Sequence, residues 1–130
     1  MSPVIERFNS GTVVPASAPF PEGVRVGNML YLSGQLGNVP GQMALVSGGL
    51  EAEARQALAN IRSVLRGQGL DFQHLVRCTV MLADMADWPA FNAVYRECFA
   101  GIPLPARSAL GCNGLALGAR VEIECIAAAP

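Results

Sequence analysis

Two short segments near the end of the chain carry residue types that can handle a small organic acid. Arg107 follows Pro105-Ala106, where a strand is expected to begin, and Glu122 and Glu124 alternate within a later strand-like segment. Side chains of a strand alternate between its faces, so both glutamates are expected on one face. An arginine can bind a carboxylate through two hydrogen bonds, and a glutamate can move a proton or orient a water. Arg107 and Glu122 therefore predict a site for a small organic acid.

These charged residues also have structural interpretations. Arg107 can pair with Glu122 or Glu124 across adjacent strands, and Glu122 can serve only as that partner. Glu124 is expected at an interface or in a salt bridge. Ser108 has no base beside it in the sequence, so no serine nucleophile is predicted.

The composition bounds the class of protein. The chain has 130 residues, which predicts one domain over residues 1–130, and 52% of them are hydrophobic while 15% are charged. A small protein with so many apolar residues is expected to bury part of its surface in an oligomer. A tightly packed monomer is the alternative. The net charge is −1 and the nine basic residues are arginines scattered along the chain, which argues against a nucleic-acid partner.

Several kinds of chemistry are excluded by residues that the chain lacks. Without lysine, the protein cannot hold pyridoxal phosphate as a Schiff base. His74 is the single histidine, which excludes a histidine-rich zinc site, and it is expected to be a surface or capping residue. The four cysteines form no C-x-x-C motif and are expected to be buried thiols in a reducing compartment: Cys78, Cys98, Cys112 and Cys125. No metal or cofactor is expected.

The first residues and the apolar segments of the chain predict where the protein is located in the cell. The first residues show neither the basic start nor the apolar run of a signal peptide, and no apolar run is long enough to span a membrane. We expect a soluble cytoplasmic protein with no membrane contact.

The elements that must position these residues follow from periodicity and turn residues. Residues 1–22 are expected to be irregular and 34–49 a loop, because both are rich in proline or glycine. Strands are predicted at 24–26, 29–33, 75–82, 106–112 and 120–127, and helices at 50–66 and from Asp87 to about Phe99. This order predicts an α+β fold, a mixed sheet with both helices on one face. The other face would be bare and is expected to pack against other subunits.

Five segments of the chain resemble the RidA/YjgF family, formerly described as L-PSP endoribonucleases or translation inhibitors. The resemblance spans nearly the whole chain and rests on five segments in register: 27–35, 53–61, Phe91-Asn92-Ala93-Val94-Tyr95, Pro105-Ala106-Arg107-Ser108 and Val121-Glu122-Ile123-Glu124. It implies a chorismate-mutase-like fold and a homotrimer around a central barrel, with three clefts between subunits. It also implies hydrolysis of reactive enamines and imines, such as 2-iminobutanoate and 2-iminopropanoate, to 2-oxo acids and ammonia, without a cofactor.

The same resemblance implies roles for individual residues. It places Arg107 on the substrate carboxylate, Glu122 beside the attacking water, and backbone groups near Ala109 and Gly34 against the substrate. Ser33 lies next to Gly34, although turn geometry also explains a glycine at residue 34. Asn92 matches an asparagine near the cleft, although it can equally form hydrogen bonds on the surface of its helix.

Two residues depart from the family pattern. Phe20, expected in the cleft wall, stands where many members have tyrosine, and it cannot form that residue's hydrogen bond. Ala109 stands where cysteine is common.

Two other functions remain open: a non-catalytic trimer that binds 2-oxo acids, and an endoribonuclease or translation inhibitor. The acidic balance and the lack of a histidine pair argue against the latter.

Overall fold

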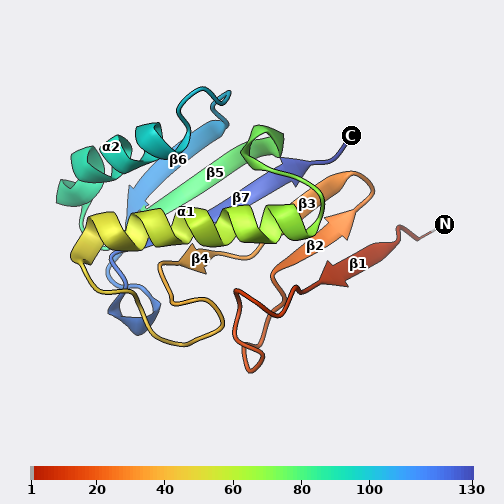
Figure 1. Cartoon of the computed structure of the whole chain (residues 1–130), viewed down its shortest axis with the longest axis horizontal. Coiled ribbons are helices and arrows are strands. Elements are labelled where there is room, and N and C mark those ends of the chain that lie inside the picture. The colour runs from red at the N-terminus through yellow and green to blue at the C-terminus, as the bar shows by residue number, and fades with distance from the viewer. Residues whose placement is uncertain (1) are drawn as a thin grey trace.

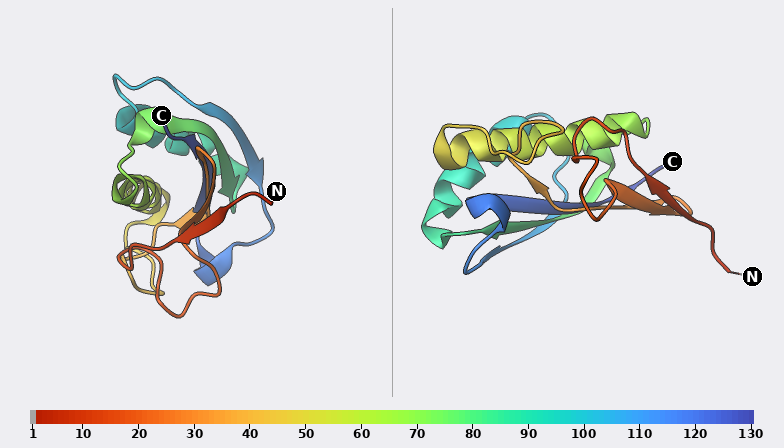
Figure 2. Two further views of the ribbon diagram at one scale, coloured as in Figure 1. Left: turned by 90° about the vertical axis from the view of Figure 1, so that its right-hand side faces the viewer. Right: turned by 90° about the horizontal axis from the view of Figure 1, so that it is seen from below.

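The fold is a mixed seven-stranded sheet with two α-helices on one of its faces (Figures 1 and 2). The computed structural model describes residues 2–130. The strands are β1 (Ile5–Phe8), β2 (Gly23–Val26), β3 (Met29–Leu32), β4 (Gln35–Leu36), β5 (Leu75–Leu82), β6 (Ala106–Gly111) and β7 (Val121–Ala128). The helices are α1 (Gly49–Gly67) and α2 (Trp88–Cys98), and short 3-10 turns lie at Phe72–His74, Met85–Asp87 and Ala116–Gly118. The predicted α+β architecture is confirmed.

The sheet order places β5 between the two strands that carry the candidate site residues. The strands lie in the order β1-β2-β3-β7-β5-β6, and β4 pairs with the end of β7 that β3 leaves free. Only β5 and β6 are parallel to each other, because α2 carries the chain back before β6 begins. β6 therefore ends the sheet, and β7 lies two strands away from it.

Alternation along β7 separates the two faces of the sheet. Val121, Ile123 and Cys125 are at most 3% exposed and join the core under the helices. The residues between them, including Glu122 and Glu124, point to the opposite face by strand alternation. No helix covers that face of the sheet (Figure 2). The amphipathic helices bury their apolar stripes on the first face, where Leu58 and Ile61 of α1 and Phe91 of α2 are at most 1% exposed.

The structure corrects the prediction that residues 1–22 are irregular and that 34–49 form a loop. Ile5–Phe8 forms β1, which pairs with β2, and Gln35–Leu36 forms β4, which pairs with β7. Both strands were missed because they are short, and β1 is mostly exposed and so shows no alternation of apolar and polar residues.

The sequence-based expectation for His74 is confirmed. Its Nδ1 accepts a hydrogen bond of 3.0 Å from the backbone N–H of Asp71, so it caps the turn before β5. Cys78 and Cys125 are buried, as expected, whereas Cys98 and Cys112 are only partly buried. No helix of residues 2–130 combines the length and hydropathy needed to cross a bilayer.

A buried carboxylate organises the segment that precedes β2. Glu22 is 1% exposed and accepts hydrogen bonds from the backbone N–H of Ser10 at 2.8 Å and from its hydroxyl at 2.7 Å. Weaker contacts come from the N–H groups of Val13 and Val14 at 3.4 and 3.5 Å. The backbone carbonyl of Glu22 in turn accepts from the N–H of Ser33. The Glu22 carboxylate therefore holds the segment from Ser10 to Val14, while its backbone carbonyl holds Ser33.

Replacing Glu22 with glutamine should destabilise the protein. The amide nitrogen would face N–H or O–H donors on either side, leaving a buried clash of donors that costs about 2 kcal/mol. The measurement is the free energy of unfolding by urea, with Glu6→Gln on the exposed strand β1 as the control. Equal effects of the two substitutions would contradict this role of Glu22.

Candidate active site

Arg107 lies at the sheet edge and reaches across to α2. Its register partner on β5 is the buried Cys78, so its side chain points to the face covered by the helices. One terminal nitrogen of its guanidinium donates a 2.7 Å hydrogen bond to Oδ1 of Asn92. The guanidinium carbon lies 4.8 Å from the ring centre of Tyr95 and 5.6 Å from that of Phe91. The structure therefore brings Arg107 and Asn92 together, as the sequence analysis predicted for one site.

Arg107 lines a hollow whose wall contains no aspartate or glutamate. This hollow measures about 260 Å³ and is lined by Trp88, Asn92, Tyr95, Arg96, Leu104, Pro105 and Arg107. Within residues 2–130, Arg107 has no carboxylate within 4.0 Å, whereas Arg62 and Arg120 are paired with Asp71 and Asp87 at 2.7 and 2.9 Å. A partly buried guanidinium that lacks a counter-charge, next to an open hollow, can bind an anion bidentately.

Glu122 lies on the opposite face of the sheet, against Gly34. A Cβ atom at residue 34 would collide with the carboxyl group of Glu122. Any residue other than glycine would therefore force this carboxyl group to move. Burial raises the pKa of Glu122 above its ordinary value of 4.5, and the nearby charge of Glu124 raises this pKa further. Gly34 and Glu122 therefore form a second group, with a carboxyl suited to holding or releasing a proton.

One chain does not bring Arg107 and Glu122 together. They point to opposite faces, and β5 separates β6 from β7. The structural interpretation in which Arg107 pairs with Glu122 or Glu124 across adjacent strands is therefore wrong. A shared site for both residues requires a second copy of the chain.

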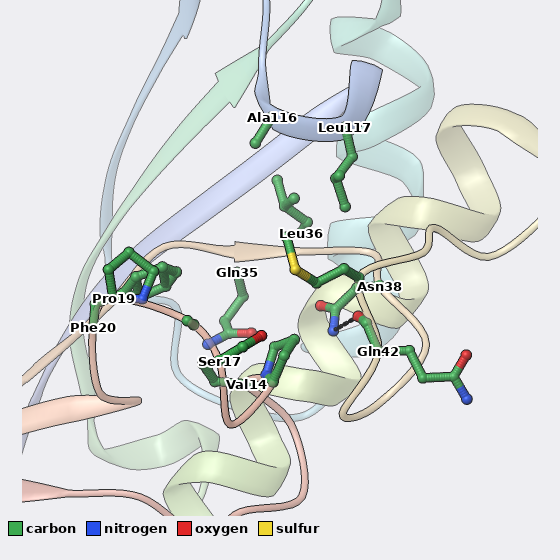
Figure 3. A pocket seen from close by; sticks show the side chains of 13 residues that line it. Val14, Ser17, Pro19, Phe20, Gln35, Leu36, Asn38, Gln42, Ala116 and Leu117 are labelled. Atoms are coloured by element: carbon green, nitrogen blue, oxygen red, sulfur yellow. Dashed lines mark hydrogen bonds between the residues drawn. The ribbon is translucent and has the colours of Figure 1, made fainter.

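The remaining predicted residues lie in other places. Phe20 is 45% exposed and lines an apolar hollow of about 220 Å³ (Figure 3), which contains neither Arg107 nor Glu122. Gln35 also lines it and has a buried Nε2 with no hydrogen-bond partner. Ser33 donates its hydroxyl to the carbonyl of Pro21 at 2.8 Å, and Ala109 packs against the core on the same face as Arg107.

Sequence reasoning missed the aromatic surroundings of Arg107. Phe91 and Tyr95 were considered as part of a segment that resembles the family and not as neighbours of Arg107, and Trp88, which is 43% exposed, was not considered. The available signal was the spacing i, i+3, i+4 and i+7 of Trp88, Phe91, Asn92 and Tyr95, because residues at this spacing lie on one side of a helix. No group of three or more histidine, cysteine, aspartate and glutamate side chains within residues 2–130 is placed to hold a metal ion.

Comparison with known proteins identifies the family. The sequence model of Endoribonuclease L-PSP matches residues 11–129. The chain belongs to this family. A curated relative from Mus musculus, named 2-iminobutanoate/2-iminopropanoate deaminase, is 44% identical over 128 residues, covering 98% of this chain and 94% of the relative. The deaminase of the same name from Homo sapiens is 41% identical over 98% of this chain and 93% of its own length. The resemblance to the RidA/YjgF family is thereby confirmed.

Solved structures in the family share the fold over nearly the whole chain. The crystal structure of YEO7_yeast aligns with a TM-score of 0.90 at 31% identity and covers 98% of this chain and 100% of its own. A structure of Escherichia coli TdcF with bound serine aligns with a TM-score of 0.87 at 27% identity, covering 96% and 99%. The predicted α+β fold is therefore shared with solved structures of this family.

Replacing Glu122 with glutamine should raise the melting temperature at neutral pH by a few degrees. A carboxyl whose pKa is raised by folding binds its proton more tightly in the folded state, so its ionisation destabilises the fold as pH rises above 4.5. The gain from Glu122→Gln should therefore shrink as the pH is lowered towards 4.5. Thermal unfolding followed across this pH range measures it, with Glu6→Gln as the control. A gain that does not change with pH would contradict the raised pKa.

Proposed function

We propose that this protein hydrolyses 2-imino acids such as 2-iminobutanoate and 2-iminopropanoate to 2-oxo acids and ammonia. The proposal rests on one observation: Arg107 lines a hollow, and its guanidinium has no carboxylate partner within the described chain. Such a group suits the carboxylate of an imino acid. The names of the relatives from Mus musculus and Homo sapiens support the same reaction.

The chemistry needs little beyond positioning and proton transfer. Water adds to the electrophilic imine carbon, and the resulting carbinolamine loses ammonia as the carbon–nitrogen bond breaks and the carbonyl forms. In this proposal Glu122 takes a proton from the attacking water and gives it to the imine nitrogen. It then takes the hydroxyl proton of the carbinolamine and gives it to the amino group that leaves as ammonia, and a raised carboxyl pKa favours these transfers. Fixing the carboxylate on Arg107 brings the imine carbon to that water, and no cofactor takes part.

The proposed site is completed between copies of the chain, which we propose form a homotrimer. Arg107 faces the helices and Glu122 faces away from them, so a cleft that contains both needs two copies. The helix-free face also exposes Tyr31 and Leu110, which are 47% and 45% exposed, and such apolar groups favour packing against another subunit.

Five further residues complete the proposed cleft. The absence of a side chain at Gly34 gives the substrate access to Glu122, while backbone groups near Ala109 and Ser33 contact it. Asn92 orients Arg107. Phe20 forms an apolar wall, a role supported by its exposed position on the hollow of Figure 3.

The proposed place of action is the cytoplasm. The four cysteines are free thiols, which is typical of proteins in a reducing compartment.

Replacing Arg107 with alanine should lower kcat/KM for 2-iminobutanoate by about 100-fold, because charge-assisted hydrogen bonds to the carboxylate are lost. The imine is generated in the assay by a threonine dehydratase, and the imine that survives is trapped with semicarbazide. Arg96→Ala is the matched control, because Arg96 lines the same hollow but, unlike Arg107, forms no hydrogen bond with Asn92 within the described residues. If the wild-type protein leaves semicarbazone formation unchanged, the deaminase proposal fails, and tight binding of 2-oxobutanoate would then favour a sensor.

Mixing two inactive variants should restore activity if the site lies between copies. Arg107→Ala lacks the carboxylate-binding residue, and Glu122→Gln should lose about 100-fold or more in kcat through loss of proton transfer. Assemblies refolded from both variants contain some clefts with an intact Arg107 and an intact Glu122, whereas neither variant alone contains any. The semicarbazide assay measures the recovery. Lack of recovery in assemblies shown by mass spectrometry to be mixed would contradict a site shared between copies.

A further inference from the structure

A column of stacked aromatic rings runs through the core beneath Arg107. The Tyr95 ring stacks on Phe99 with ring centres 4.5 Å apart, and Phe99 stacks on Phe72 at 4.7 Å. Both ends of the column carry a guanidinium: Arg107 lies 4.8 Å from the ring centre of Tyr95, and Arg62 lies 4.8 Å from that of Phe72. The column joins α2 to the turn that precedes β5 and to the strand that carries Arg107.

The two ends of this column differ in their electrostatic partners. Arg62 binds Asp71 through hydrogen bonds of 2.7 and 3.2 Å, so its charge is already compensated. Within residues 2–130, Arg107 is held by neutral groups alone, the amide oxygen of Asn92 and the aromatic rings of Tyr95 and Phe91. Neutral partners attract the guanidinium but leave its charge available to an anion.

Tyr95 offers Arg107 the face of its ring and not its hydroxyl group. The side chain is 5% exposed, and its hydroxyl oxygen is buried without a hydrogen-bond partner. Burial raises the pKa of this hydroxyl, so it stays neutral and does not supply a negative charge to Arg107. Phe99, which is 2% exposed, stacks on the Tyr95 ring and holds it in place.

We propose that Tyr95 is a positioning residue for the substrate: its ring face fixes the plane of the Arg107 guanidinium so that the nitrogens not bound to Asn92 point into the hollow. Asn92 fixes one end of the guanidinium and Tyr95 fixes its plane, which together orient a planar group. A carboxylate bound bidentately must lie in that plane, so Tyr95 also sets the direction from which the substrate binds. This inference rests on the proposed function of Arg107 as the carboxylate-binding residue.

The test compares variants that keep or remove the ring. Tyr95→Leu should raise KM for 2-iminobutanoate and Kd for 2-oxobutanoate by the same factor, between about 2-fold and 30-fold, the range expected for a lost cation–π contact. kcat should change by less than about twofold, since Glu122 is untouched. Tyr95→Phe should restore both constants, because the hydroxyl makes no hydrogen bond. If Tyr95→Leu does not fold, Tyr95→Met removes the ring while filling more of the space.

Phe72→Leu is the matched control, because it removes a ring from the same column without touching Arg107. It should lower the melting temperature as Tyr95→Leu does but leave KM and Kd unchanged. Equal shifts of Kd in Phe72→Leu and Tyr95→Leu, or an unchanged Kd in Tyr95→Leu, would overturn the proposal.

The binding measurement separates this inference from the proposed function. If the wild-type protein binds 2-oxobutanoate but hydrolyses no imine, the deaminase proposal fails, and the Kd series still decides the role of Tyr95. If the wild-type protein does not bind 2-oxobutanoate, the carboxylate site at Arg107 is wrong, and the role of Tyr95 is overturned with it.

Discussion

The proposed chemistry depends on an arginine that is fixed in place without a carboxylate partner. A partly buried charge is costly unless other groups compensate it. At Arg107 the compensation comes from the oxygen of Asn92 and from the ring of Tyr95, both of which are neutral. An acidic partner would have stabilised the side chain better, but it would also have occupied the anion site. The absence of acidic residues from the wall of the neighbouring hollow has the same consequence.

The sheet both supports and divides the candidate site. Its core face holds Arg107 against α2, while its bare face carries Glu122 beside Gly34. A carboxylate ligand and a proton-transfer group on opposite faces cannot act on one small molecule within one chain. Assembly is therefore part of the proposed active site, and the bare, partly apolar face provides the surface for it.

The sequence predicted both helices and the long strands because their periodicity is strong. It predicted Arg107 from its residue type and position, and Asn92 through the family resemblance. It could not predict that β5 lies between β6 and β7, because strand order depends on pairings between distant segments. The spacing from Arg107 to Glu122 therefore suggested a proximity that one chain does not have. The contact between Tyr95 and Arg107 was not predicted, because burial in the core and contact with Arg107 produce the same pattern in a helix.

The most direct test of this account is a crystal structure of the protein with 2-oxobutanoate bound. We expect the carboxylate of the ligand to be bidentate on Arg107 of one copy, with its carbonyl carbon facing Glu122 of a neighbouring copy across a water molecule. A carboxylate bound away from Arg107, or a ligand enclosed by one chain with no Glu122 beside it, would contradict the account.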